Sequence, residues 1–74
     1  MLTYDECYKI ATNYSESNNV NFDSVTEDEQ AYMYDDSQQS YAGKVPFVVS
    51  KETGSILGAW EYLNRFDKTF DDFK

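Results

Sequence analysis

Two short apolar runs joined by a turn constrain the fold more than any other feature of this chain. Residues 45–50 read VPFVVS, residues 55–58 read SILG, and KETG lies between them. Gly54 suits the left-handed conformation that closes many hairpin turns. Pro46 has no N–H to donate to a β-ladder, so it belongs at the start of the first strand. The pattern predicts two strands joined by a turn, which is a β-hairpin.

The start of the chain carries the signals of a helix N-terminus. Thr3 and Glu6 fit a capping box, in which each side chain bonds an otherwise unpaired backbone amide. Apolar side chains then recur at three- and four-residue steps, at Tyr4, Cys7, Tyr8, Ala11 and Tyr14. The polar residues 15–19 are expected to end this helix.

The middle of the chain is assigned from composition. Residues 31–34 read AYMY and favour a strand. Val20 and Phe22 alternate with asparagines and are compatible with another short strand, while residues 26–29 are read as an acidic loop or the start of a strand. Residues 35–43 are polar and end in glycine, so we expect a loop there.

Two interpretations stay open for the segment after Gly58. A stripe at offsets of three and four residues predicts a helix over 59–66, interrupted at 67–69; its members are Ala59, Tyr62, Leu63, Phe66, Phe70 and Phe73. Alternatively, the strand continues, with alternate residues from Ile56 to Tyr62 on one face. We favour the helix. The expected fold is α+β in one domain spanning residues 1–74: an N-terminal helix packed on a small antiparallel sheet of three to four strands, with a short C-terminal helix.

Charge limits the possible functions. Fourteen acidic residues stand against six basic ones, there is no histidine, and the formal net charge is −8. This excess opposes binding to phosphate backbones, so we expect no direct nucleic-acid partner. Without histidine the chain lacks the commonest general base and a usual zinc ligand, so we expect no catalytic residues, no cofactor and no metal site. Cys7, the single cysteine, falls on the apolar stripe of the first helix and is expected in the core.

The sequence also bears on location. No apolar run approaches the length of a membrane span, and the start lacks the pattern of a secretory signal. A lone cysteine fits a reducing compartment. We therefore expect a cytoplasmic protein without a membrane partner, whose oligomeric state the sequence leaves open.

Acids interleaved with aromatic residues predict a surface for recognising a protein. The acids cluster at 27–29, at 35–36, and at 67 with 71–72. Acids of this kind steer a basic partner, and tyrosine or tryptophan rings supply buried anchors. Plain solubility is the alternative explanation for each cluster. The expected partner-binding residues are Glu27, Asp28, Glu29, Tyr32, Tyr34, Asp35, Asp36, Tyr41 and Trp60.

Three blocks of the chain resemble one known family. Residues 1–14 are similar to the N-terminal helix of the immunity protein 35 (YrhB-like) family, residues 42–56 resemble its central signature, and residues 61–63 resemble its closing Glu-Tyr-Leu helix. Lys44 and Ser50 depart from the asparagine and aspartate usual in that family. The resemblance implies a small intracellular αβ domain that neutralises a bacterial toxin by direct binding. It implies no catalytic residues.

Three other functions remain open. A phage or mobile-element inhibitor that mimics nucleic acid toward a host enzyme would share the acidic face. A chaperone-like or structural accessory protein would recognise exposed apolar surface, and its binding would resist salt. A small carboxylate enzyme would need two acids with raised pKa in one pocket.

Overall fold

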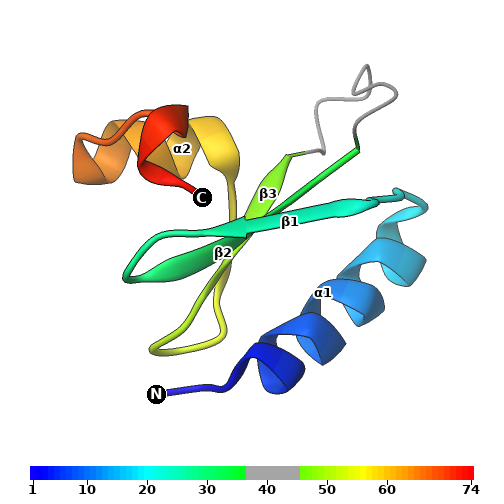
Figure 1. Ribbon diagram of the computed structural model, residues 1–74. Coiled ribbons are helices and arrows are strands. Elements are labelled where there is room, and N and C mark those ends of the chain that lie inside the picture. The colour runs from blue at the N-terminus through cyan, green and yellow to red at the C-terminus, as the bar shows by residue number, and fades with distance from the viewer. Residues whose placement is uncertain (37–45) are drawn as a thin grey trace.

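Two helices lie on opposite sides of a four-stranded sheet in the computed structural model, which describes residues 1–36 and 46–74 (Figure 1). In chain order the elements are α1 (Tyr4–Asn18), β1 (Ser24–Glu27), β2 (Ala31–Asp35), β3 (Phe47–Ser50), β4 (Ile56–Gly58), α2 (Ala59–Phe66) and the 3-10 helix η1 (Phe70–Asp72). Neighbouring strands pair antiparallel in the order β1-β2-β3-β4. The expected α+β fold is confirmed.

The side chains at the ends of α1 account for its bounds. Thr3 Oγ1 accepts a hydrogen bond from the Glu6 amide at 3.2 Å, and Glu6 Oε1 accepts one from the Thr3 amide at 2.8 Å, which confirms the predicted capping box. The helix continues through the polar segment that was expected to end it. It stops only at Asn19, which takes the left-handed conformation with φ 54° and donates its backbone N–H to the Ser15 carbonyl. Asparagine tolerates this conformation better than most residues.

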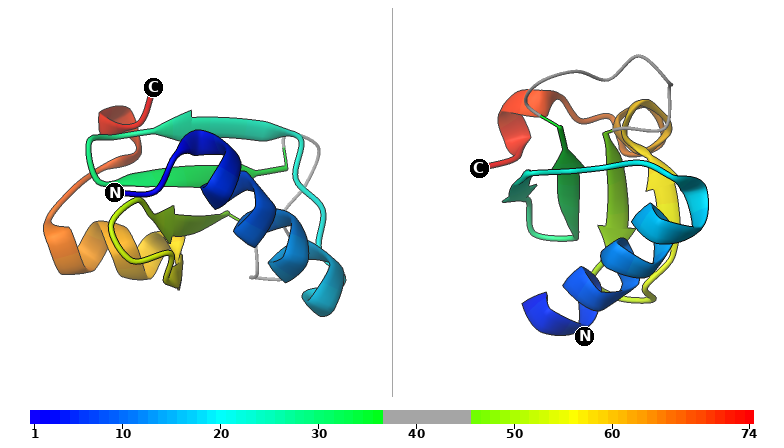
Figure 2. Two further views of the ribbon diagram at one scale, coloured as in Figure 1. Left: turned by 90° about the horizontal axis from the view of Figure 1, so that it is seen from below. Right: turned by 90° about the vertical axis from the view of Figure 1, so that its right-hand side faces the viewer.

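The two central strands are buried on both faces. One face packs against α1 through Tyr32, Tyr34, Phe47 and Val49, which contact Cys7 and Ala11. The other face packs against α2 and the segment after it through Ala31, Met33 and Val48, which contact Ala59, Tyr62, Leu63 and Phe73. Successive strand side chains point to opposite faces, so the continuous apolar runs AYMY and FVV supply both cores. The strands lie side by side in Figure 2, and α1 packs on the sheet over β2 and β3.

The predicted hairpin and second helix are confirmed. Gly54 has φ +79° in the turn between β3 and β4, as the sequence suggested. The helix spans Ala59–Phe66, so the continued strand is wrong for this segment. It ends where Asp67 takes φ 54° and donates its backbone N–H to the Leu63 carbonyl.

Two expectations for the middle of the chain are revised. Val20 and Phe22 do not form a strand; Val20 is buried, and Phe22 packs against the α1 side of the core from the segment that leads into β1. The expected loop at 35–43 begins later than predicted, because Asp35 still pairs with Ser24 at the end of β2. Residues 37–43 of that expectation lie outside the described residues.

The Tyr34 hydroxyl is a buried polar group without a hydrogen-bond partner among residues 1–36 and 46–74. Burial raises the pKa of this phenol, so the group stays neutral. We expect Tyr34→Phe to raise the free energy of unfolding by about 1 kcal/mol, because it removes a desolvated hydroxyl. The ring contacts with Phe22 and Phe47 would remain. Urea unfolding followed by circular dichroism measures the change.

Tyr62→Phe is the matched control for that prediction. The Tyr62 hydroxyl is also buried, but it donates to Asp28 Oδ2 at 2.8 Å. Hydrogen bonds to charged groups contribute more than neutral ones, so the same substitution here should lower the free energy of unfolding by about 1.5–3 kcal/mol. Shifts of the same sign in both variants would contradict the different environments of the two hydroxyls.

Candidate functional site

The acidic cluster at residues 27–29 is paired within the protein. Glu27 Oε2 lies 2.6 Å from Lys51 Nζ. Lys68 Nζ lies 2.7 Å from Asp28 Oδ2 and 3.4 Å from Glu29 Oε1. Two lysines from distant parts of the chain therefore offset much of the negative charge at the β1–β2 turn.

Asp28 makes the most contacts of the three acids, and its side chain is only 4% exposed. Oδ1 accepts the amides of Gln30 and Ala31 at 2.8 and 2.7 Å, and Oδ2 accepts Tyr62 Oη and Lys68 Nζ. We call this set the Asp28 network. Burial alone would raise the pKa of Asp28, but the hydrogen bonds from Lys68, the two amides and Tyr62 outweigh burial and lower it. Asp28 was expected on the partner surface; its carboxylate instead fastens the β1–β2 turn to α2.

Two of the three tyrosines expected to anchor a partner lie in the core. Tyr34 has no exposed surface and Tyr32 is buried beside it, both on the face covered by α1. Lys51 Nζ sits 4.6 Å from the centre of the Tyr32 ring, which closes that ring off further. Both side chains therefore lie in the interior and not on the expected interface. Tyr41, the third expected tyrosine, lies outside the described residues.

The other expected acids lie away from the Asp28 network. Asp35 and Asp36 stand at the opposite end of β2, both half-buried, and Asp35 Oδ1 accepts the Asp36 amide at 2.8 Å. Glu27 and Glu29 are exposed at the β1–β2 turn. Glu27 forms an ion pair with Lys51, and Glu29 forms one with Lys68. The fold therefore does not bring the predicted acids into one surface.

Among the expected aromatic residues that the structure describes, Trp60 is the one that is open to solvent. It is 60% exposed and meets Phe70, which is 44% exposed, at a centroid distance of 5.6 Å and an interplanar angle of 78°. A shallow hollow of roughly 490 Å³ is lined by Trp60, Leu63, Asn64, Asp67 and Lys68. Phe70 was missed as a surface residue because the apolar stripe suggested that it faces the core.

Three acids lie close to this aromatic pair along the chain. Asp67 lines the hollow, and Asp71 and Asp72 follow Phe70 in η1. None of the three forms an ion pair with another described residue. We call Trp60, Asp67, Phe70, Asp71 and Asp72 the Trp60 patch.

The lysine beside the hollow does not neutralise it. Lys68 Nζ is held by Asp28 and Glu29, and the hydrogen bond to Asp28 is the main cause of its raised pKa. Its side chain is 16% exposed. The Trp60 patch therefore combines exposed aromatic surface with carboxylates that pair with no lysine or arginine in residues 1–36 and 46–74, an arrangement that attracts cationic groups.

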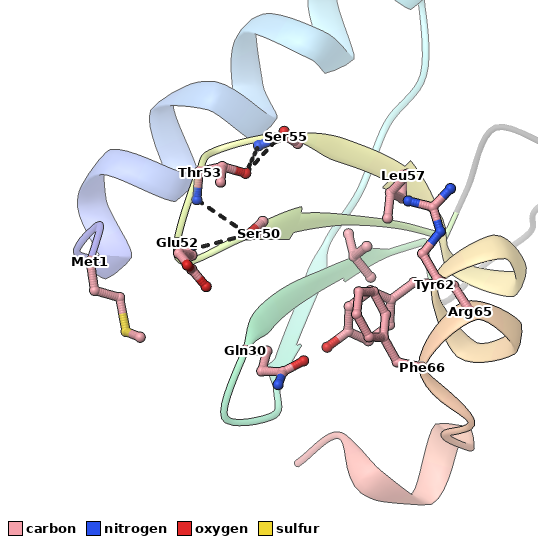
Figure 3. A pocket seen from close by; sticks show the side chains of 11 residues that line it. Met1, Gln30, Ser50, Glu52, Thr53, Ser55, Leu57, Tyr62, Arg65 and Phe66 are labelled. Carbon is pink, nitrogen blue, oxygen red and sulfur yellow. Dashed lines mark hydrogen bonds between the residues drawn. The ribbon is translucent and has the colours of Figure 1, made fainter.

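A second hollow, of about 380 Å³, lies against a different face of α2 (Figure 3). Its floor comes from β3, β4 and the turn between them, and α2 contributes Tyr62, Arg65 and Phe66. Met1 and Phe66 are exposed beside it. The Ser50 and Thr53 hydroxyls are hydrogen-bonded within the turn, so the groove mainly offers apolar contact.

The sequence also raised three other features: the single cysteine, a metal site and a membrane span. Cys7 is fully buried as predicted, and burial raises the pKa of its thiol. Within residues 1–36 and 46–74, no group of three or more cysteine, aspartate or glutamate side chains is placed to hold a metal ion. No helix in the described part of the chain has the length and apolar character needed to cross a membrane.

No family model, curated protein or solved structure matches this chain.

Proposed function

We propose that this protein binds a second protein with a basic surface and neutralises it, as an immunity protein does with a bacterial toxin. The observation that carries the proposal is the Trp60 patch, where exposed rings stand among acids that form no ion pair with the described residues. The net charge of −8 favours a basic partner. The resemblance of residues 1–14 and 42–56 to the immunity protein 35 family supports a toxin as that partner.

Binding alone would produce the neutralisation. The acids would raise the rate of encounter with a basic surface, to as much as about 10⁸ M⁻¹s⁻¹ at low salt. Trp60 and Phe70 would then bury apolar area at the centre of the contact, where tryptophan commonly contributes about 2 kcal/mol or more. The protein would cover the active surface of its partner and would perform no reaction.

The support beneath the Trp60 patch favours this role. Lys68 joins the segment after α2 to Asp28, and Phe73 is buried in the core beyond η1. Phe70 and Asp71 are thus held between two fixed points. A surface that is already ordered loses less conformational entropy on binding, so more of the contact energy appears as affinity.

A charge reversal within the patch provides the test. We expect Asp71→Lys to slow association with the partner about fivefold at low salt, because steering depends on local charge, and to change dissociation less. Glu16→Lys on α1 makes the same change in net charge away from the patch and should alter association less than about twofold. The partner would be isolated from the native cell with a tagged chain, and surface plasmon resonance at several salt concentrations would give the rates.

Two results would contradict the proposal. One is an association rate that is independent of salt and equal for both variants. The other is a captured partner whose expression does not slow bacterial growth, or whose effect on growth is unchanged by co-expression of this chain.

The second hollow, which lies between α2 and the β3–β4 hairpin, favours one alternative, a chaperone-like or structural accessory protein that binds apolar segments. Its floor and the exposed Phe66 would bury apolar side chains, and such binding would persist at high salt. In that case Phe66→Ala would weaken capture, whereas Asp71→Lys would leave it unchanged.

A further inference from the structure

We infer that the hollow beside Trp60 receives an arginine side chain of the partner, whose guanidinium stacks on the indole and pairs with the Asp67 carboxylate. This inference rests on the proposed function and names the group that the Trp60 patch recognises. Three independent properties of the hollow support it: an exposed indole, a carboxylate that forms no ion pair with the described residues, and the end of a helix.

The indole is held in place and remains accessible. Phe70 meets it at 78°, so the phenyl ring fixes the indole without lying parallel over it. The residue keeps 60% of its surface exposed, and it is one of the residues that line the hollow. Tryptophan is the best aromatic partner for a cation placed over its ring.

The polar groups of the hollow complement a planar cation. Asp67 and Asn64 supply oxygen acceptors from the last turn of α2 and the residue that ends it. Lys68 does not compete for them, because its ammonium lies 2.7 Å from Asp28 Oδ2. The hollow also adjoins the C-terminal end of α2, where the helix dipole favours positive charge.

These features select arginine over lysine. A guanidinium is flat, so it stacks on an indole, and its fork of N–H groups can donate two hydrogen bonds to one carboxylate. A lysine ammonium is compact and more strongly hydrated, and it gains less from the ring. We therefore expect the partner to present an arginine to the Trp60 patch.

Trp60 itself provides the measurement, because it is the only tryptophan in the chain. The full chain would be titrated with acetyl-Gly-Arg-Gly-amide while indole fluorescence is recorded. We expect saturable binding in the millimolar range. The same peptide with citrulline, an uncharged analogue of arginine, should bind at least about tenfold more weakly, and the lysine peptide about threefold more weakly.

Two variants locate the site. Asp67→Asn should weaken binding of the arginine peptide about fivefold. Glu16→Gln on α1, which likewise replaces a carboxylate with an amide and removes one negative charge, should leave binding unchanged. The inference is overturned if the arginine peptide produces no saturable change, if citrulline or lysine binds as tightly, or if Asp67→Asn has no effect.

The outcome separates this inference from the proposed function. If the peptide result is negative while Asp71→Lys still slows association with the partner, the proposed function stands and the arginine assignment falls. The peptide could instead bind as expected while Trp60→Ala and Asp71→Lys leave capture of the partner unchanged. In that case the hollow is an arginine site, and the proposed function is contradicted.

Discussion

Replacing Asp28 with alanine is expected to lower the free energy of unfolding by about 3–5 kcal/mol. The substitution removes the closer acceptor of the Lys68 ammonium and leaves only Glu29, at 3.4 Å, beside it. It also removes the acceptor of the buried Tyr62 hydroxyl and unpairs two turn amides. A chain of 74 residues has a stability of roughly 4–11 kcal/mol, so the loss is a large part of the total. Chemical unfolding followed by circular dichroism would measure it.

Glu29→Ala is the control for this prediction. Glu29 also contacts Lys68, but at 3.4 Å and with a side chain that is 81% exposed. Ion pairs of this kind contribute little, so the free energy of unfolding should change by less than about 1 kcal/mol. Similar losses in the two variants would show that simple removal of an acid near Lys68, and not the Asp28 network, determines the effect.

The Asp28 network also predicts how stability depends on pH. The pKa of Asp28 is lowered in the folded state, so its contribution is complete above the ordinary aspartate value of about 3.9 and is lost as pH falls through the folded value. Lys68 behaves oppositely: its pKa is raised, so its contribution is complete below about 10.4 and is lost as pH rises through the folded value. Asp28→Asn should therefore flatten the acid side of the stability profile.

Gly54→Ala is expected to cost about 1–3 kcal/mol of folding free energy. Gly54 has φ +79°, a conformation that an L-side chain adopts only with strain. An added Cβ would also lie 2.9 Å from Ile10 Cδ1 and 3.1 Å from Leu2 Cδ1. Both contacts are ends of flexible side chains that can shift, so backbone strain should dominate the cost. Thermal and urea unfolding would give the change.

Gly58→Ala separates backbone strain from the general effect of removing a glycine. Gly58 has φ −62°, and nothing lies within 4 Å of an added Cβ. Alanine would restrict the unfolded chain, which stabilises the fold, but it is a poorer residue at a helix N-cap, so the two effects oppose. We expect a change within about 0.5 kcal/mol. A loss as large as that of Gly54→Ala would contradict the role assigned to positive φ.

Local signals made α1, the β3–β4 hairpin and α2 predictable. A capping box, a turn glycine and an apolar stripe each act within a few residues, so the sequence displays them directly. The exposed position of Phe70 was harder to predict from the sequence. Asp67 ends α2 in the left-handed conformation, which changes the direction of the chain and turns Phe70 away from the face predicted by the helical stripe.

Whether the misplaced site residues are buried or exposed depends on packing between distant segments. Residues 31–34 suit either an exposed aromatic surface or a strand buried on both faces, and the choice depends on α1 and α2 covering opposite sides of β2. An unbroken apolar run is itself typical of a doubly buried strand, a signal that could have identified Tyr34 as a core residue. The pairing of Asp28 with Lys68 spans 40 residues and leaves no local trace.

The segment that follows α2 is fastened at both of its ends. Lys68 pairs with Asp28 before η1, and beyond η1 the backbone N–H of Lys74 donates to the Glu27 carbonyl at 2.9 Å. The outward residues between these anchors contribute little to the interior. Their identities can diverge while the scaffold persists, so related chains could acquire different binding specificities by exchanging a handful of side chains on an otherwise constant frame.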